Sequence, residues 1–204
     1  MASNLTKDIL KRTEGMLKFA MLGLQDLIYG PPERKLAGLS NLIVFGRAVT
    51  NVLQNLRSTE TDFDKWYEKY KNEMKSDPLM KYFYNLRSEI LKEGILKTST
   101  QLFIKRLQIP GDLNRFGPPP PNAKGFFIGD NIGGSGWEVQ LPDGSIDKYY
   151  VRLPYDIGSV SLHFPESPAS HLGQKVKDSS IEALSKIYVD YLLRVVEAAK
   201  KEFN

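Results

Sequence analysis

The chain has 204 residues, of which 41% are hydrophobic, and a formal net charge of +4. This length suits one domain with a core of ordinary size and leaves little room for two independent domains. The sequence has no cysteine, which excludes disulfides, thiolate metal sites and cysteine nucleophiles. A reducing compartment is compatible with this composition, and we expect the cytoplasm.

Neither a secretion signal nor a membrane span is predicted. No window approaches the roughly 18 consecutive apolar residues that a span needs. Residues 1–11 mix Lys, Asp and Arg instead of leading into an apolar stretch. The two histidines, His163 and His171, are eight positions apart, without the close spacing of a metal-binding pair. We therefore expect no membrane anchor, no metal and no cofactor.

Two long helices are predicted first. Apolar residues recur at three-and-four spacing over residues 4–29 and again over residues 33–57, with Gly30, Pro31 and Pro32 between them. The second helix is apolar nearly all round, so we expect it at the centre of a bundle. Gly46 lies among the regularly spaced apolar residues of the second helix. It indicates a close crossing with another helix, where no side chain larger than a hydrogen atom fits.

Two shorter helices follow. Thr61 is a candidate N-cap for the third helix, whose aromatic face we interpret as a packing surface and not as a base-stacking platform. Asp77 before Pro78 predicts the start of a fourth helix, and Gly94 its end. The aromatic face consists of Phe63, Trp66, Tyr67, Tyr70 and Met74.

Strand patterns begin after Gly94. We predict a strand within residues 98–109, a proline-rich connection without helix, a hairpin over residues 137–153 and a further strand over residues 160–164. A capping box, Ser179 to Glu182, begins a last helix that returns to the bundle.

The predicted fold class is therefore α+β. It is an antiparallel bundle of four to five helices, with a small antiparallel β-meander inserted before the C-terminal helix. We expect one domain, 1–204, made of a helical bundle, a β-rich elaboration with Pro-rich and Gly-rich loops, and the C-terminal helix; these occupy residues 1–95, 96–168 and 174–204.

Basic residues gather at the start of the β-rich part. Residues 97–124 contain five basic residues and one acidic residue, Asp112, with aromatic residues between them. The stretch could therefore bind the phosphates of a nucleic acid. The alternative is a solvated strand and loop kept soluble by Lys and Arg. The five candidates for nucleic-acid or anion binding are Lys97, Lys105, Arg106, Arg115 and Lys124.

The glycine-rich segment 129–136 has the composition of a phosphate-binding loop. A nucleotide P-loop needs Lys and then Ser or Thr at the start of a helix, whereas Trp137 begins a strand pattern here. We therefore interpret the segment as a flexible loop between strands, with a flap over a binding surface as the alternative.

The fourth helix carries the sequence L-R-S-E-I-L-K-E-G from Leu86 to Gly94. With the paired long helices before it, this part of the chain, about residues 1–95, resembles the HEPN superfamily, whose members place an R-x4-6-H motif on such a helix. The resemblance implies a metal-independent ribonuclease that acts as a dimer. Arg87 matches the family arginine, whereas Lys92 stands where the histidine would be.

This replacement bears on chemistry, because a histidine exchanges protons near neutral pH whereas a lysine stays a cation unless it is buried. On an ideal helix Arg87 flanks the buried stripe and Lys92 points away from it. Glu93 projects toward the stripe, so it should have a partner such as Arg47 or Arg87 or lie beyond the end of the core. Candidate catalytic residues are therefore Arg87, Lys92 and Glu93.

We expect a non-catalytic HEPN-like interaction or regulatory module that forms a homodimer and binds RNA or a protein partner. The alternative is an RNA-binding protein or a metal-independent endoribonuclease that uses Arg87 and Lys92. A structural reading also stays open, in which Arg87 pairs with an acid at the edge of the bundle and Lys92 lies in solvent.

Overall fold

A computed structural model describes residues 3–203. They form two compact units. The helical unit is the described part of Met1–Leu96 and Glu166–Asn204, and the β unit is Lys97–Pro165. Long helices with small antiparallel sheets before the last helix confirm the predicted α+β class. The limits of the units lie close to the predicted segment bounds, 95 and 168, while the single-domain organisation stays a prediction.

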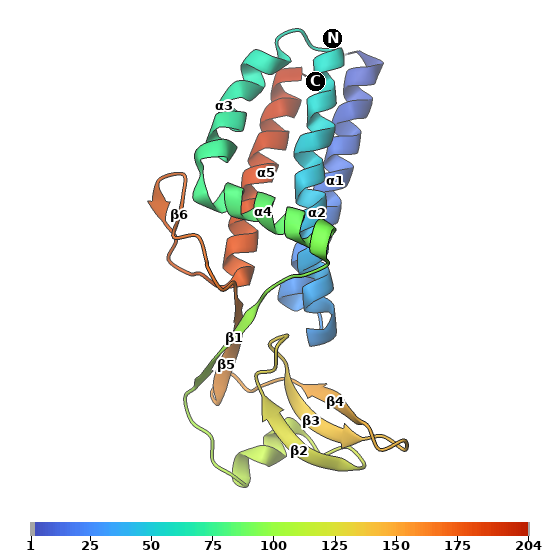
Figure 1. The fold of residues 1–204 in the computed structure, drawn as a ribbon, viewed down its shortest axis with the longest axis vertical. Coiled ribbons are helices and arrows are strands. Elements are labelled where there is room, and N and C mark those ends of the chain that lie inside the picture. The colour runs from blue at the N-terminus through green and yellow to red at the C-terminus, as the bar shows by residue number, and fades with distance from the viewer. Residues whose placement is uncertain (1–2, 204) are drawn as a thin grey trace. The chain divides into compact units, whose positions relative to one another are not determined.

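The helical unit contains the bundle that the apolar stripes predict (Figure 1). The first, second and last helices lie alongside one another, and the fourth crosses over the second and the last. The second helix is central, as predicted, because Leu39, Leu42, Ile43 and Val49 have no exposed surface. The helices are α1 (Asn4–Tyr29), α2 (Pro32–Leu53) with a 3₁₀ extension (Gln54–Ser58), α3 (Phe63–Ser76), α4 (Pro78–Glu93) and α5 (Ile181–Phe203).

Both ends of α4 follow the prediction. The Asp77 side chain accepts a hydrogen bond from the Met80 amide, 2.9 Å away, and Pro78 occupies the first turn. Gly94 ends the helix in the left-handed conformation, with φ of 67°.

Two other helix starts differ from the prediction. The residue before α3 is Asp62 and not Thr61, because the Phe63 amide bonds to the Glu60 carbonyl in a turn that takes in Thr61. At α5 the capping side chain is that of Ser180, which accepts from the Ala183 amide at 3.3 Å. The predicted reciprocal bond of the capping box is replaced by a contact of 3.7 Å between the Glu182 carboxylate and Lys35.

Glycines allow two close approaches in the bundle. A Cβ on Gly23 would lie 2.6 Å from the Gly38 carbonyl oxygen, so α1 and α2 touch backbone to backbone at these two residues. A Cβ on Gly46 would lie 2.5 Å from the ring of Tyr188. Only a hydrogen fits at Gly46, as predicted, but its neighbour is an aromatic ring of α5 and not a helix backbone.

The β unit contains two separate antiparallel sheets. The predicted hairpin is confirmed, because Trp137 pairs with Tyr149 across it. The first predicted strand is shorter than expected and pairs with the last, with Leu102 opposite Val160. The sheets are β1 (Ser99–Ile104) with β5 (Gly158–His163), and β2 (Ala123–Ile128), β3 (Ser135–Gln140) and β4 (Ile146–Val151) in that order.

Two short elements were not predicted. A 3₁₀ helix, Gly111–Phe116, lies in the proline-rich connection, where the Asp112 carboxylate accepts from the Gln108 amide at 2.7 Å and Phe116 packs on Phe126. In the helical unit, β6 (Ser170–His171) and β7 (Gln174–Lys175) form a small hairpin before α5.

One helical stretch, Pro32–Ser58, is long and apolar enough by length and composition to cross a membrane, with a mean hydropathy of 1.4. These values belong to an 18-residue window of the stretch, and 44% of that window is buried inside the fold. The core helix of a bundle has the same length and hydropathy. The expectation of no membrane anchor stays a prediction.

Candidate functional site: a cationic cleft in the helical unit

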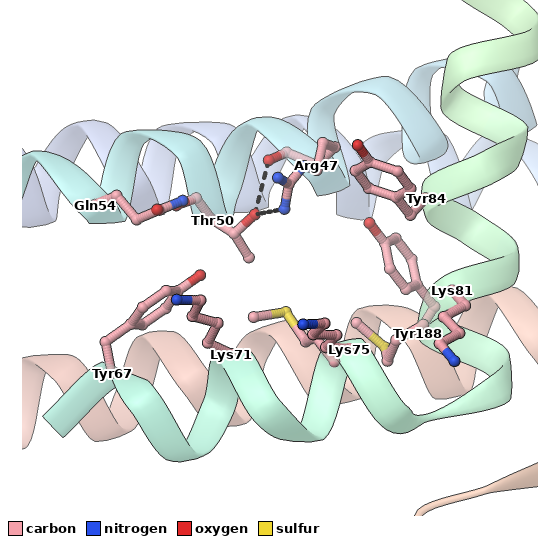
Figure 2. Close-up of a pocket in the computed structure, with 11 residues that line it drawn as sticks. Arg47, Thr50, Gln54, Tyr67, Lys71, Lys75, Lys81, Tyr84 and Tyr188 are labelled. Carbon is pink, nitrogen blue, oxygen red and sulfur yellow. Dashed lines mark hydrogen bonds between the residues drawn. The ribbon is translucent and has the colours of Figure 1, made fainter. Parts of the chain in front are cut away.

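A cleft of about 410 Å³ opens between α2, α3 and α4 in the helical unit, and Tyr188 of α5 contributes to its lining (Figure 2). This volume lies within the range of small-molecule sites in proteins, roughly 300–1,000 Å³. The lining residues are Arg47, Thr50 and Gln54, then Tyr67, Lys71, Met74 and Lys75, then Met80, Lys81 and Tyr84, and finally Tyr188.

The charges that line the cleft are all positive. Arg47 comes from α2, Lys71 and Lys75 from α3 and Lys81 from α4, and no carboxylate of residues 3–203 lines the cleft. None of the four has an ion-pair partner within residues 3–203. Lys71 and Lys75 are one turn apart, a spacing at which like charges repel by roughly 0.2–0.5 kcal/mol. An anion in the cleft would relieve this repulsion.

Arg47 is held in place by its own helix. Its Nη1 donates to the Thr50 hydroxyl at 2.9 Å, and that hydroxyl donates to the Arg47 carbonyl at 3.1 Å. The guanidinium also lies over the ring of Tyr84, 5.2 Å from its centre. Arg47 is thus a fixed fork of donors that still has N–H groups for a ligand.

Two phenols stay neutral beside these cations. Burial raises the pKa of Tyr67, although Arg47 and Arg57 oppose the change. Burial likewise raises the pKa of Tyr188, which stacks on Phe83 with ring centres 4.3 Å apart. Both hydroxyls therefore stay protonated near neutral pH and can donate hydrogen bonds to an anion.

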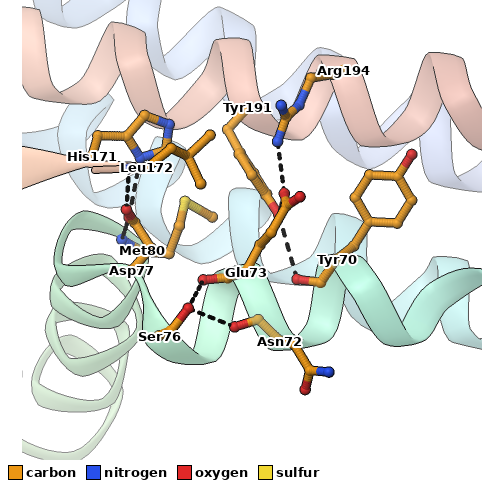
Figure 3. A network of polar contacts seen from close by, with 10 residues as sticks. All are labelled: Tyr70, Asn72, Glu73, Ser76, Asp77, Met80, His171, Leu172, Tyr191 and Arg194. Atoms are coloured by element: carbon orange, nitrogen blue, oxygen red, sulfur yellow. Dashed lines mark hydrogen bonds and ion pairs between the residues drawn. The ribbon is translucent and has the colours of Figure 1, made fainter. Parts of the chain in front are cut away.

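Two acids, Glu73 of α3 and Asp77 at its end, bind groups other than the cations of the cleft (Figure 3). Glu73 of α3 points to α5, where its carboxylate accepts from Arg194 at 2.8 Å and from the Tyr191 hydroxyl at 3.1 Å. Asp77, at the corner between α3 and α4, accepts from the Leu172 amide at 2.6 Å and contacts His171 Nδ1 at 3.0 Å. These bonds fix the corner between α3 and α4, and neither carboxylate is among the residues that line the cleft.

The hydrogen bonds to Asp77 set its ionisation. Burial alone would raise the pKa of this carboxyl, but the amides of Leu172 and Met80 and the His171 ring hold it below its usual value. Asp77 is consequently ionised at neutral pH and joins the β6–β7 hairpin to the start of α4.

Arg87, Lys92 and Glu93 do not line the cleft. Arg87 is half-buried on α4, and Lys92 and Glu93 are exposed at the end of that helix. Within residues 3–203 none of the three has an ion-pair partner. Glu93 therefore lies beyond the end of the core, one of its two predicted positions. The roles of Arg87 and Lys92 stay predictions.

The five basic candidates of the β unit are not equivalent. Arg115 bonds to both Asp156 oxygens, at 2.9 and 2.7 Å, and to Asp112 at 3.2 Å. Lys105 lies 4.1 Å from the centre of the Tyr155 ring. The remaining candidates, Lys97, Arg106 and Lys124, are exposed. Arg115 is thus neutralised by acids of its own unit.

Several amides of the glycine-rich segment are already bonded within the loop. The Asp130 carboxylate accepts from the Ile132 and Gly134 amides, from Lys148 and from the Tyr150 hydroxyl, at 2.8–3.1 Å. Burial alone would raise the pKa of Asp130, but these bonds lower it. The chain's own carboxylate occupies the position that a phosphate would take in an anion-binding loop.

The aromatic face of α3 is a packing surface at Phe63, Trp66 and Tyr70, as predicted, whereas Tyr67 and Met74 also line the cleft. Phe63, Tyr67 and Tyr70 are buried, and Trp66 meets Phe203 of α5 edge to face, with ring centres 5.1 Å apart. Within residues 3–203 no three acidic or histidine side chains gather in a way that could hold a metal ion.

The sequence prediction missed the cleft as a site. A signal was present in two polar stripes, because Arg47, Thr50 and Gln54 recur at three-and-four spacing on an otherwise apolar helix. Lys71 and Lys75 recur in the same way beside Tyr67. What could not be read from the sequence is that α4 brings these stripes together.

Comparison with known proteins gives one partial likeness. Residues 25–108 match the model of a family described as bacteriophage lambda protein ea47. The matched segment holds ten of the eleven residues that line the cleft, all but Tyr188. No curated protein and no solved structure matches the chain.

Proposed function

We propose that the helical unit is a non-catalytic binding module that holds an anionic small molecule in the cationic cleft. The observation that carries the proposal is the set of four cations, Arg47, Lys71, Lys75 and Lys81, in one cleft without a carboxylate. Cations without an acidic partner repel one another and gain most from an incoming anion.

The chemistry of the lining supports binding over catalysis. General acid–base catalysis needs a group with a pKa near the working pH, such as a histidine or a perturbed carboxyl. The cleft is lined instead by an arginine, lysines and phenols, and burial raises the pKa of the phenols Tyr67 and Tyr188. Such groups donate hydrogen bonds and carry charge.

The proposal retains two expectations from the sequence, the HEPN-like resemblance and the homodimer. The lysine at position 92 agrees with a module that has lost its proton-transfer residue. A ribonuclease assay would contradict this part if the wild type cut RNA and the Arg87→Ala variant did not.

Calorimetric titration with inorganic pyrophosphate at low ionic strength tests the proposed function. Wild type should bind, and Arg47→Gln should weaken binding at least about tenfold, because charge-assisted hydrogen bonds are lost. Arg12→Gln is the matched control, since Arg12 is an exposed arginine of α1 that pairs with Asp8.

The control should bind pyrophosphate like the wild type. Circular dichroism must show that both variants keep their helices. Equal binding by wild type and Arg47→Gln, or no binding by either, would overturn the proposed function.

A further inference from the structure

The ribbon of β1 and β5 in the β unit has a polar face that carries one exposed phenylalanine. Successive side chains of a strand alternate between its two faces. A Cβ on Gly129 would lie within 4 Å of the side chains of Thr100 and Leu102, so the glycine-rich loop packs on the face that these two residues share. The other face consists of Ser99, Gln101 and Phe103 of β1 and of Ser159, Ser161 and His163 of β5.

Two exposed aromatic rings flank Lys105. The exposed fraction is 60% for Phe103 and 82% for Tyr155. Lys105 follows Phe103 by two residues, so their Cα atoms lie at most about 7 Å apart. The Lys105 ammonium lies 4.1 Å from the centre of the Tyr155 ring, over one face of that ring. Because so much of Tyr155 is exposed, the other face of its ring is accessible to a ligand.

The charges on the ribbon are positive. Residues 97–106 contain Lys97, Lys105 and Arg106 and no acid, and β5 contains no acid either. Within residues 3–203 none of these three cations has an ion-pair partner. Arg106 interacts electrostatically with Asp112 and Asp156 at longer range. Lys105 is the cation that contacts an exposed ring, so a negative group beside that ring would meet it.

The polar face also presents hydrogen-bonding groups. The Ser161 hydroxyl and Nε2 of His163 are 3.0 Å apart, and Gln101 stands opposite Ser161 in the strand register. The amide of Gln101 is exposed and can both donate and accept. Such side chains bond to the edges of unpaired bases.

We propose that the β1–β5 ribbon binds single-stranded nucleic acid. Bases stack on Phe103 and Tyr155, the Lys105 ammonium binds a backbone phosphate, and Gln101 bonds to a base edge. Exposed rings beside cations suit an unpaired strand, because every base has a face that can stack and every linkage carries a negative charge. This surface lies within the β unit and does not depend on the cleft of the helical unit.

Fluorescence anisotropy with labelled oligothymidylate and oligouridylate of about 12 nucleotides tests the proposal. Phe103→Ala and Tyr155→Ala should each weaken binding at low salt at least about fivefold, since a base loses its stacking partner. Lys105→Gln should also weaken binding and should reduce the slope of log affinity against log salt by about 0.7, the value for one phosphate of a single strand. The tighter of the two oligonucleotides tells whether DNA or RNA is preferred.

Two matched controls should bind like the wild type. Tyr149→Ala removes an exposed tyrosine from β4, in the other sheet of the β unit, and Lys18→Gln removes an exposed lysine from α1. Circular dichroism must show that every variant keeps its fold, which is expected because each changed side chain is exposed.

Several outcomes would overturn the inference. One is the absence of oligonucleotide binding at low salt, and another is equal binding by all variants. A duplex that bound as tightly as the single strand would contradict stacking, because its bases are paired. Polyglutamate that competed as well as an unlabelled oligonucleotide would assign the ribbon to an acidic protein partner instead. Binding that was lost in Arg47→Gln and kept in Phe103→Ala would place the strand in the cleft, so the ribbon would be wrong and the proposed function would stand.

Discussion

The two units differ in whether their candidate anion-binding groups have acidic partners. In the β unit, acids of the chain satisfy two of the groups that the sequence marks as anion-binding: Asp130 fills the glycine-rich loop, and Asp112 and Asp156 hold Arg115. In the helical unit, the four cations of the cleft have no acidic partner within residues 3–203. The difference teaches that an anion site is marked by cations without partners and not by basic or glycine-rich sequence alone.

Asp130→Ala should have the largest effect on this comparison. It leaves two loop amides and Lys148 without their acceptor, so the free energy of unfolding of the β unit should fall by about 2–4 kcal/mol. Trp137 of β3 reports on this unit by fluorescence in urea, in a Trp66→Phe background that removes the other tryptophan.

Glu138→Ala, which removes an exposed carboxylate from the same strand as Trp137, is the control and should change stability little. If Asp130→Ala proved as stable as this control, the loop would not depend on its internal carboxylate.

Gly46→Ala should have an intermediate effect that reaches the cleft. The added methyl would meet the Tyr188 ring, which should cost about 1–3 kcal/mol in the free energy of unfolding and displace a wall of the cleft. Urea unfolding followed by the circular dichroism of the helices measures the stability, and calorimetry measures pyrophosphate affinity, which should decrease.

Gly15→Ala is the matched control for Gly46→Ala, because a Cβ there meets nothing within 4 Å. This change should stabilise α1 by up to about 1 kcal/mol through helix propensity. Equal stabilities of the two glycine variants would contradict the packing of Tyr188 against α2.

Asp77→Asn should have the smallest of these effects, about 1–2 kcal/mol at neutral pH, through a weakened helix cap and a lost acceptor for Leu172. The pKa of Asp77 is lower in the fold than its ordinary value of 3.8, so its contribution is present above that pH. It should be lost as the pH falls below about 4 toward the folded pKa.

The difference in stability between wild type and Asp77→Asn should thus be present at about pH 5 and should shrink below about pH 4. Urea unfolding at a series of pH values, followed through Trp66 in a Trp137→Phe background, checks this. Asp62→Asn, an exposed carboxyl without a capping bond, should show no such dependence. A difference that grew as the pH fell below about 4 would contradict the lowered pKa of Asp77.

Much of the fold was predictable because local signals and packing agree. The stripes of α1 and α2, the Asp77–Pro78 start, the Gly94 end and the β3–β4 hairpin each follow from residue type and spacing. The pairing of β1 with β5 and the β6–β7 hairpin were not predicted, because contacts between distant parts of the chain decide them. Glu182 illustrates the same cause at a helix start, because a contact with Lys35 replaces its local cap.

The candidate site was less predictable than the fold. Arg47 appeared in the sequence only as a potential partner for Glu93, since a lone arginine on an apolar helix suggests a buried ion pair. Its actual neighbours, Thr50 and Tyr84, are a hydroxyl and a ring, and Tyr84 comes from another helix. The crossing of α4 over α2 makes a cleft from stripes that are unremarkable separately.

The most direct test of the central claim compares one arginine from each unit. Pyrophosphate is titrated into wild type, Arg47→Gln and Arg115→Gln under identical low-salt conditions. If the cleft binds the anion, Arg47→Gln should bind pyrophosphate at least about tenfold more weakly than the wild type. Arg115→Gln should bind it like the wild type, because Asp112 and Asp156 already pair with the Arg115 guanidinium. Loss of binding in Arg115→Gln with full binding in Arg47→Gln would contradict the account.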